Sequence, residues 1–215
     1  MPNRKSALER IKSTGVLAVV RRTTVEQVHR CVEALVAGGV DCIELPIVSL
    51  SGLTAFAQVR AAYGESLCLG AGSVFNAELA TMAFGMDVDF ISGPGSDASV
   101  VRVCKVRDVL PFPGAMTPSE VIRAWHSGAD LIKILPADVL GVAYFQHLRH
   151  QIPGAELAAA GGVNETNVAS FIRVGAAAVV VGRGLLGEAR PESADYGAIT
   201  ARAQRLLAVV ADSRH

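Results

Sequence analysis

The sequence predicts a single-domain α/β fold, a (β/α)8 barrel of the TIM-barrel type, because short strand-like and longer helix-like segments alternate along the chain. Eight apolar runs rich in β-branched residues recur at similar intervals: Val16–Val20, Val40–Leu45, Leu67–Gly70, Val88–Ser92, Val109–Phe112, Leu131–Leu135, Glu156–Ala160 and Ala178–Val181. Eight units with short connections favour a closed parallel barrel. The rival is an open doubly wound sheet, but the first turn, Arg21–Thr24, lacks the glycines typical of that fold.

Helix signals separate the predicted strands. A polar, helix-forming segment over about residues 3–14 predicts an N-terminal helix, and Val25–Gly38 carries helical spacing and ends on two glycines. Further helices are expected after capping-type residues or a first-turn proline, namely Ser51, Asn76, Asp97, Pro118 and Asn164. No linker or low-complexity run interrupts the pattern, so we expect one domain over residues 1–215.

The composition suits a compact globular protein and argues against several other classes. Apolar residues make up 51% of the chain and 20 basic residues balance 20 acidic ones, so a polyanionic partner such as nucleic acid is not expected. No apolar run is long enough to span a membrane, and the polar N-terminus lacks the apolar core of a signal peptide. The four cysteines have no zinc-like spacing, and we expect free thiols in the cytoplasm.

Lys133 is the first candidate catalytic residue. It is one of four lysines and stands alone within the apolar segment Leu131–Pro136. Strand alternation places it on the same face as Leu131 and Leu135, with two isoleucines on the other face. If the isoleucines pack under the helices, Lys133 points into the barrel, where burial favours the neutral amine that can attack a ketone. The alternative is a lysine that reaches the rim or forms a structural ion pair.

Glu44 occupies a comparable position in the second predicted strand. It shares a face with Cys42, and not with Ile43 and Leu45, so it also points into the barrel. An amine and a carboxylate in one barrel provide a nucleophile and a proton shuttle. As a buried ion pair alone they would contribute little net stability, so catalysis is the better explanation.

Two glycine-rich strand ends indicate an anion site. Gly161 and Gly162 follow the seventh predicted strand, and Gly182 and Arg183 follow the eighth. The loops after these two strands are where TIM barrels commonly bind phosphate through backbone amides. Arg183 could add a charge-assisted contact, although a solvated arginine at the rim explains it nearly as well.

Three further residues at predicted strand ends are candidates for substrate binding. Arg21 follows the first strand and can pair with a substrate carboxylate. Ser73 supplies a hydroxyl in the glycine-rich loop after the third strand, and Pro94 lies in the Gly-Pro-Gly loop after the fourth. Each of these loops could equally be ordinary turn chemistry.

These motifs resemble those of a known family across nearly the whole chain. In order, they are Ile43–Pro46, Gly70–Val74, Gly93–Gly95, Pro113–Gly114, Ile132–Ala137 and Gly161–Val163. The chain resembles the 2-keto-3-deoxy-6-phosphogluconate (KDPG) and 6-phosphogalactonate (KDPGal) aldolases, a family that also includes 4-hydroxy-2-oxoglutarate (KHG) aldolases. The segment that begins at Lys133 is the most specific match.

The resemblance implies a class I aldolase that forms a homotrimer and uses no metal or cofactor. It implies that Lys133 forms a Schiff base and that Glu44 is the acid/base residue. It also implies that Ser73 lies near the pyruvyl carboxylate, and that Gly161 and Gly162 belong to a phosphate loop. The reaction expected is cleavage of a 2-keto-3-deoxy-6-phospho sugar acid to pyruvate and glyceraldehyde 3-phosphate.

The sequence also departs from the gluconate-type pattern. Val48 stands where gluconate-type enzymes carry an arginine, and Ala160 stands where they carry a threonine. The Glu-Leu-Pro motif and an arginine after the first strand look more like the galactonate branch, in which Arg21 could hold the substrate carboxylate. We therefore expect the chain to be closer to that branch.

Other functions fit parts of the pattern. One is an aldolase for an unphosphorylated 2-keto acid such as KHG, and another is a phosphate-binding barrel isomerase or epimerase that uses the carboxylate as base and the lysine as a clamp. A third is a non-catalytic barrel that binds sugar acids. A metal-dependent aldolase is not expected, because the candidate ligands fall on predicted helices: His29, His126, His147 and His150.

Overall fold

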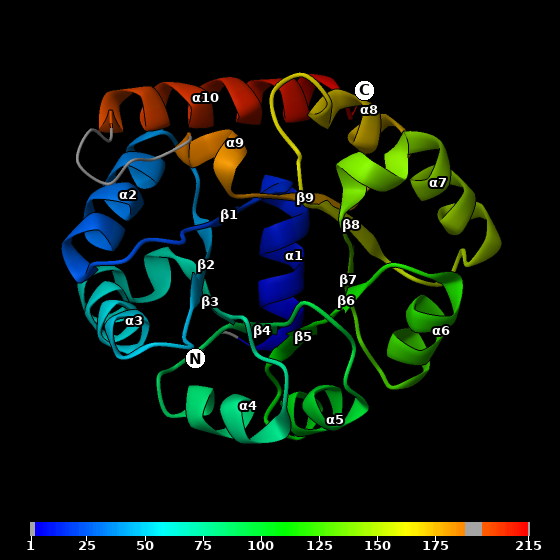
Figure 1. The fold of residues 1–215 in the computed structure, drawn as a ribbon, viewed down its shortest axis with the longest axis horizontal. Helices are drawn as coiled ribbons and strands as arrows, with labels where there is room; N and C mark the ends of the chain where they lie inside the picture. Colours follow the sequence, from blue (N-terminus) through cyan, green and yellow to red (C-terminus); the bar gives the residue numbers. More distant parts are fainter. Residues whose placement is uncertain (1–2, 188–194, 215) are drawn as a thin grey trace.

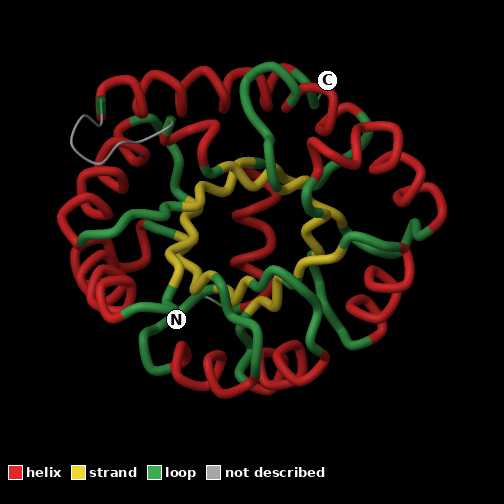
Figure 2. The backbone as a smooth tube through the Cα atoms, in the orientation of Figure 1, coloured by secondary structure: helices red, strands yellow, loops and turns green. Residues whose placement is uncertain are grey.

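A ring of parallel strands forms the centre of the molecule, and helices surround it (Figures 1 and 2). The structure is a computed structural model that describes residues 3–187 and 195–214. The strands are β1 (Val16–Val19), β2 (Cys42–Pro46), β3 (Cys68–Gly72), β4 (Phe90–Ser92), β5 (Leu110–Phe112), β6 (Gly114–Ala115), β7 (Ile132–Ile134), β8 (Leu157–Ala160) and β9 (Ala178–Val181). They lie in the order β5-β4-β3-β2-β1-β9-β8-β7-β6. The predicted (β/α)8 barrel is confirmed over the described residues.

The fifth position of the barrel is one strand in two parts, β5 and β6, which Pro113 separates. A proline has no backbone N–H and so interrupts a strand ladder. The Pro113 carbonyl nevertheless accepts a hydrogen bond of 2.9 Å from the backbone amide of Lys133. Because β5 pairs with β4 and β6 pairs with β7, this strand joins the two ends of the sheet and the eight predicted barrel positions are all present.

Helices connect the strands around the outside of the ring, apart from the first (Figure 1). They are α1 (Arg4–Thr14), α2 (Val25–Ala37), α3 (Leu50–Tyr63), α4 (Ala77–Phe84), α5 (Ala98–Val106), α6 (Pro118–His126), α7 (Ala137–Gln151), α8 (Val168–Arg173), α9 (Arg183–Leu186) and α10 (Tyr196–Asp212), with a 3-10 turn, η1 (Gly64–Ser66), after α3. No helix of the described residues is long and apolar enough to cross a membrane.

Most helix starts follow the capping residues in the sequence. Asn76 and Asp97 cap α4 and α5 as predicted, and Pro118 opens α6 after a capping box between Thr117 and Glu120. The start predicted after Ser51 was two residues late, because the side chain of Ser49 accepts the hydrogen bond from Gly52 instead.

Asn164 was wrongly predicted to cap the next helix. Its Oδ1 accepts hydrogen bonds from the amide of Thr166 at 2.9 Å and from its hydroxyl at 2.7 Å, so it closes a turn. The helix α8 begins only at Val168, after Asn167. The loop after β8 is therefore longer than the sequence suggested.

The core has two layers on the two faces of the strands. Ile132 and Ile134 belong to the layer between strands and helices, whereas Leu131 belongs to the layer inside the ring. Ala7 and Ile11 of α1 join the inner layer. The polar side chains of α1 contact residues that precede strands: Arg10 pairs with Asp41, and Lys12 pairs with Glu156. Thus α1 closes the amino-terminal end of the barrel and leaves the carboxyl-terminal end as the open one.

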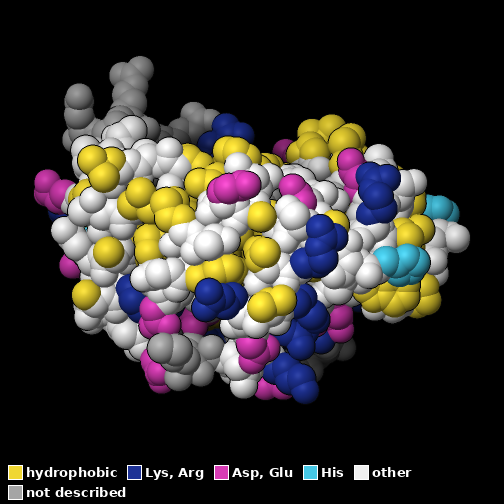
Figure 3. Space-filling model, turned by 90° about the horizontal axis from the view of Figure 1, so that it is seen from below, with side chains coloured by type: hydrophobic (Ala, Val, Ile, Leu, Met, Phe, Trp, Pro, Cys, Tyr) yellow, Lys and Arg dark blue, Asp and Glu magenta, His cyan; other side chains and the backbone are white. Residues whose placement is uncertain are grey.

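Several large apolar side chains remain on the outer surface. Figure 3 shows groups of hydrophobic side chains among charged ones on the face that α4 and α5 form, which is lowest in Figure 1. Among the described residues, five such side chains are more than half exposed: Val48, Leu50, Phe75, Val106 and Val139. Isolated exposed apolar residues are ordinary, but a group of them is a candidate surface for contact between chains.

Candidate active site

Lys133 lies inside the barrel, as its strand pattern predicts. It is the central residue of β7 and stands in register with Gly114 of β6 and Ala158 of β8. The residue as a whole is 6% exposed. Because the isoleucines on either side pack under the helices, the lysine side chain can only enter the interior.

Three groups surround the Lys133 amine. Its Nζ donates a hydrogen bond of 2.5 Å to Oγ of Ser92 and lies 3.5 Å from Oε2 of Glu44. The ring of Phe112 lies below it, with its centroid 5.7 Å from Nζ. The amine is thus held between a hydroxyl, a carboxylate and an aromatic face, and Lys133 lines the cavity above it.

Glu44 is 1% exposed and reaches the same point from β2. Its register partners are Val19 of β1 and Gly70 of β3. A Cβ atom on Gly72 would overlap the Glu44 carboxylate, so glycine at this position leaves the space that the side chain occupies. The loop motif that begins at Gly70 therefore shapes the acid site, a role that the sequence alone did not indicate.

Ser92 is a site residue that the sequence analysis missed. It is fully buried at the end of β4, with Oγ against Lys133. The signal was present, because Ser92 shares strand parity with Phe90, and Phe90 packs in the inner layer of the core. A polar residue on the inward face at the carboxyl end of a barrel strand is a candidate on that ground alone.

A cavity of about 590 Å³ opens above the lysine. Its lining includes most of the residues predicted for the site: Lys133, Glu44, Arg21, Gly161, Gly162, Gly182 and Arg183. Arg22 and Asp138 also line it and were not predicted. Arg21 and Arg183 are exposed, and Arg22 donates to the backbone carbonyls of Arg21 and Leu186. The buried amine and carboxylate thus lie at the base of a cavity whose wall carries three guanidinium groups.

Ser73 and Pro94 do not line this cavity. Ser73 lines an adjoining cavity of about 520 Å³ that shares Arg21 and Arg22 with the first. Its φ of 62° is a left-handed conformation that non-glycine residues rarely adopt. Pro94 is exposed, and its carbonyl packs against Gly114. Their role in substrate binding therefore stays a prediction.

The loop after β8 has a conformation fixed by hydrogen bonds. Gly161 and Gly162 have φ values of 85° and 68°, which favour glycine. The Gly161 carbonyl accepts from the backbone amide of Asp138 at 3.2 Å. The Gly162 carbonyl accepts from the side-chain amides of Asn164 and Asn167. Both glycines line the cavity, and the carboxylate of Asp138 lies against Gly162.

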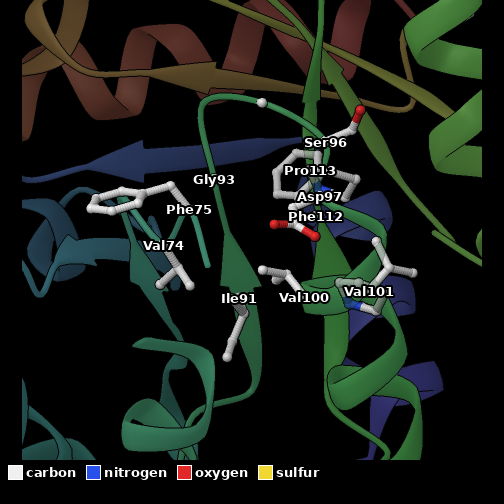
Figure 4. A pocket seen from close by; sticks show the side chains of 12 residues that line it. Val74, Phe75, Ile91, Gly93, Ser96, Asp97, Val100, Val101, Phe112 and Pro113 are labelled. Atoms are coloured by element: carbon white, nitrogen blue, oxygen red, sulfur yellow. The ribbon is translucent and has the colours of Figure 1, made fainter. Parts of the chain in front are cut away.

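A smaller cavity of about 190 Å³ lies between β4, β5 and α5 (Figure 4). Its one ionisable lining residue, Asp97, caps α5, and hydrogen bonds from the hydroxyl and amide of Ser99 lower the pKa of Asp97. It contains neither Lys133 nor Glu44. This cavity carries no candidate catalytic group.

The described residues hold no group of three or more His, Cys, Asp or Glu side chains arranged to bind a metal ion. The four histidines predicted on helices lie there: His29 in α2, His126 in α6, and His147 and His150 in α7.

Comparison with known proteins gives a consistent result. The family model for KDPG and KHG aldolase matches residues 8–202. The 2-dehydro-3-deoxy-phosphogluconate aldolase of Treponema pallidum is 29% identical over 205 residues, which cover 95% of this chain and 96% of that protein. The 2-dehydro-3-deoxy-6-phosphogalactonate aldolase of Escherichia coli is 28% identical over 193 residues, which cover 88% and 94%.

A solved structure, described as native KDPGal, superimposes with a TM-score of 0.85 at 25% identity and covers 92% of this chain and 95% of its own. Relatives from the gluconate and galactonate branches match about equally well, so the expected closeness to the galactonate branch stays a prediction. The family model spans most of the chain and includes both Lys133 and Glu44. The chain belongs to the KDPG and KHG aldolase family.

Proposed function

We propose that this chain is a class I aldolase that cleaves a 2-keto-3-deoxy-6-phospho sugar acid, of the 6-phosphogalactonate or 6-phosphogluconate type, to pyruvate and glyceraldehyde 3-phosphate. The observation that carries the proposal is the buried amine of Lys133, 3.5 Å from the carboxylate of Glu44 at the base of an open cavity. The named activities of its relatives support the same reaction.

Lys133 is the nucleophile in the proposed reaction. Its neutral amine attacks the C2 ketone of the substrate, and loss of water from the carbinolamine gives an iminium. Removal of the proton from the C4 hydroxyl breaks the C3–C4 bond, and the electron pair of that bond moves into the iminium to form an enamine. The aldehyde leaves. Protonation of the enamine at C3 and hydrolysis by water then release pyruvate and regenerate the amine.

Glu44 is the proposed acid/base group. Its carboxylate takes the C4 hydroxyl proton through a water molecule and exchanges the protons of the carbinolamine. Ser92 accepts a hydrogen bond from the amine at 2.5 Å, so it helps to hold Nζ in position before the attack.

The cationic wall of the cavity suits an acidic substrate. We assign the C1 carboxylate to Arg21, because Val48 stands where related enzymes carry an arginine. We assign the distal phosphate to Arg183 and to the backbone amides of Gly161, Gly162 and Gly182. Ser73 lines the adjoining cavity that shares Arg21 and Arg22, so we keep it and Pro94 as candidate substrate-binding residues beside the main cavity.

The proposal extends to the state of the protein in the cell. We propose one domain over residues 1–215, of which residues 1–2, 188–194 and 215 lie outside the described part.

Four free, buried cysteines support a location in the reducing cytoplasm. We also propose a homotrimer, which the family resemblance implies, and the exposed apolar side chains offer surface for contact between chains. The proposed reaction uses no cofactor and no metal, and we expect full activity after EDTA treatment.

Reduction with borohydride in the presence of pyruvate tests the reaction class. An aldolase of this type forms an imine with pyruvate that borohydride reduces to a stable adduct, and the adduct inactivates the protein. An isomerase or epimerase that uses Lys133 only as an electrostatic clamp forms no reducible imine. Pyruvate release from the two phosphorylated epimers, from their unphosphorylated forms and from KHG then ranks the substrates.

A further inference from the structure

Asp138 is a charged residue of the cavity that the proposed mechanism does not use. It lies in the first turn of α7, directly beyond the strand that carries Lys133. Its backbone amide donates to the Gly161 carbonyl at 3.2 Å, and its Oδ1 accepts a hydrogen bond of 2.9 Å from the amide of Val139. Two hydrogen bonds thus fix the position of this residue beside the loop after β8.

The Asp138 carboxylate packs directly against Gly162. A Cβ atom on Gly162 would overlap Cγ and Oδ2 of Asp138, so the carboxylate covers the glycine at close range. Within the described residues, Oδ2 has no hydrogen-bond partner and no Lys or Arg lies within ion-pair distance of the carboxylate. One carboxylate oxygen is therefore available to a molecule in the cavity.

The surrounding charges make this carboxylate unusual. The other ionisable groups that line the cavity are Glu44 and Lys133 at its base and three arginines on its wall. An acid in the first turn stabilises a helix through its negative charge, and Oδ1 of Asp138 also accepts a hydrogen bond there. This role in the helix gives no reason to place an uncompensated carboxylate where an acidic substrate binds.

The position of Asp138 relative to Lys133 determines which part of the substrate it meets. In the proposed mechanism the substrate is attached to Lys133 through C2, and Ala160, Gly161 and Gly162 line the same cavity, so C4 to C6 of the substrate can reach them. A carboxylate against Gly162 accepts a hydrogen bond from a hydroxyl on these carbons. The same carboxylate repels a phosphate dianion bound at the glycine backbone.

We propose that Asp138 is a specificity residue that binds a hydroxyl group in the aldehyde half of the substrate and weakens the preference for a phosphorylated over an unphosphorylated chain end. The inference rests on the proposed aldolase function and refines its substrate class. The charge of Asp138, and not its size, carries the effect.

The test compares Asp138→Asn with wild type on 2-keto-3-deoxy-6-phosphogluconate and unphosphorylated 2-keto-3-deoxygluconate. Asparagine keeps the size and the Oδ1 acceptor but removes the charge. The ratio of kcat/KM for the phosphorylated over the unphosphorylated substrate should rise by about tenfold or more, the range expected for one charge-assisted contact. The change should lie mainly in KM. A ratio within twofold of wild type, or a lower one, overturns the proposal.

Glu78→Gln is the matched control. Glu78 is also an exposed acid in the first turn of a helix, α4, but it lines neither the catalytic cavity nor the adjoining one. It should leave the substrate ratio unchanged. If Glu78→Gln raises the ratio as much as Asp138→Asn does, a general loss of negative charge explains the result and the proposal fails.

Binding of glycerol 3-phosphate provides a second readout that needs no turnover. Calorimetry should show tighter binding to Asp138→Asn than to wild type, and unchanged binding to Glu78→Gln. Equal binding to all three proteins overturns the role of Asp138. Failure of the aldolase function looks different, since wild type would then release no pyruvate from any substrate and form no reducible imine.

Discussion

Replacement of Gly72 by alanine tests whether glycine at this position in β3 is needed to keep the Glu44 carboxylate of β2 in place. A Cβ atom at this position would overlap Oε1, Cδ and Cγ of Glu44. Glu44 is 1% exposed and its Oε2 lies 3.5 Å from Nζ of Lys133, so a shift of the side chain away from Gly72 changes the distance between the carboxylate and the amine. The substitution therefore has to displace the carboxylate, the strand or both.

The expected cost follows from this overlap. An extra methyl group in a closely packed interior typically destabilises a protein by about 1–3 kcal/mol. For a domain of this size that corresponds to a decrease in Tm of roughly 2 to 12 °C. Full removal of a positioned acid/base group slows turnover by about 10² to 10⁴, and partial displacement should cost at least about tenfold in kcat.

Gly95→Ala is the matched control for Gly72→Ala. A Cβ atom on Gly95 meets nothing within 4 Å, and its φ lies outside the left-handed region, so alanine fits there without strain. The assay is pyruvate release at saturating substrate, with thermal unfolding followed in parallel. Wild-type kcat and Tm in Gly72→Ala would refute the reasoning, because the carboxylate would then not need the space that glycine leaves.

Substitutions at four further residues test the assigned roles. Lys133→Arg and Lys133→Ala should both abolish pyruvate release while circular dichroism shows an intact fold, since arginine keeps the charge but forms no imine; substantial activity in Lys133→Arg would exclude the Schiff base. Glu44→Gln should still trap pyruvate slowly under borohydride but lose about 10² to 10⁴ in turnover, whereas a wild-type rate would remove Glu44 from the mechanism. Arg21→Ala should raise the apparent dissociation constant for pyruvate roughly 10- to 150-fold, and Arg183→Ala should weaken binding of phosphorylated substrates alone. An unchanged pyruvate constant in Arg21→Ala, measured by imine trapping, would mean that another group holds the carboxylate.

The strand pattern was sufficient to predict the barrel and the direction of its two central side chains. Alternation along a strand is a local property, so the apolar neighbours of Lys133 and Glu44 determine which face each occupies. The same rule would have identified Ser92 from Phe90. The inward-facing residues of each strand, up to its last residue, were therefore as informative about the site as the motifs.

The loops could not be predicted in the same way. Ser73 has a left-handed conformation and Pro94 is exposed, and no residue pattern in the local sequence indicates either property. The contact between Asp138 and Gly162 joins the loops after two different strands. Asn164 had the right residue type for a helix cap, but its side chain closes a turn. Residue type indicated function at strand ends, whereas loop packing determined which residues reach the cavity.

The location of the borohydride-reduced pyruvate adduct tests the central claim most directly. The chain has four lysines, of which Lys12 and Lys105 form ion pairs with Glu156 and Asp130 away from the cavity. Peptide mass spectrometry of the reduced protein should place one pyruvyl adduct on Lys133, with loss of activity in proportion to labelling. No adduct, or an adduct on another lysine with Lys133 unmodified, would contradict the account.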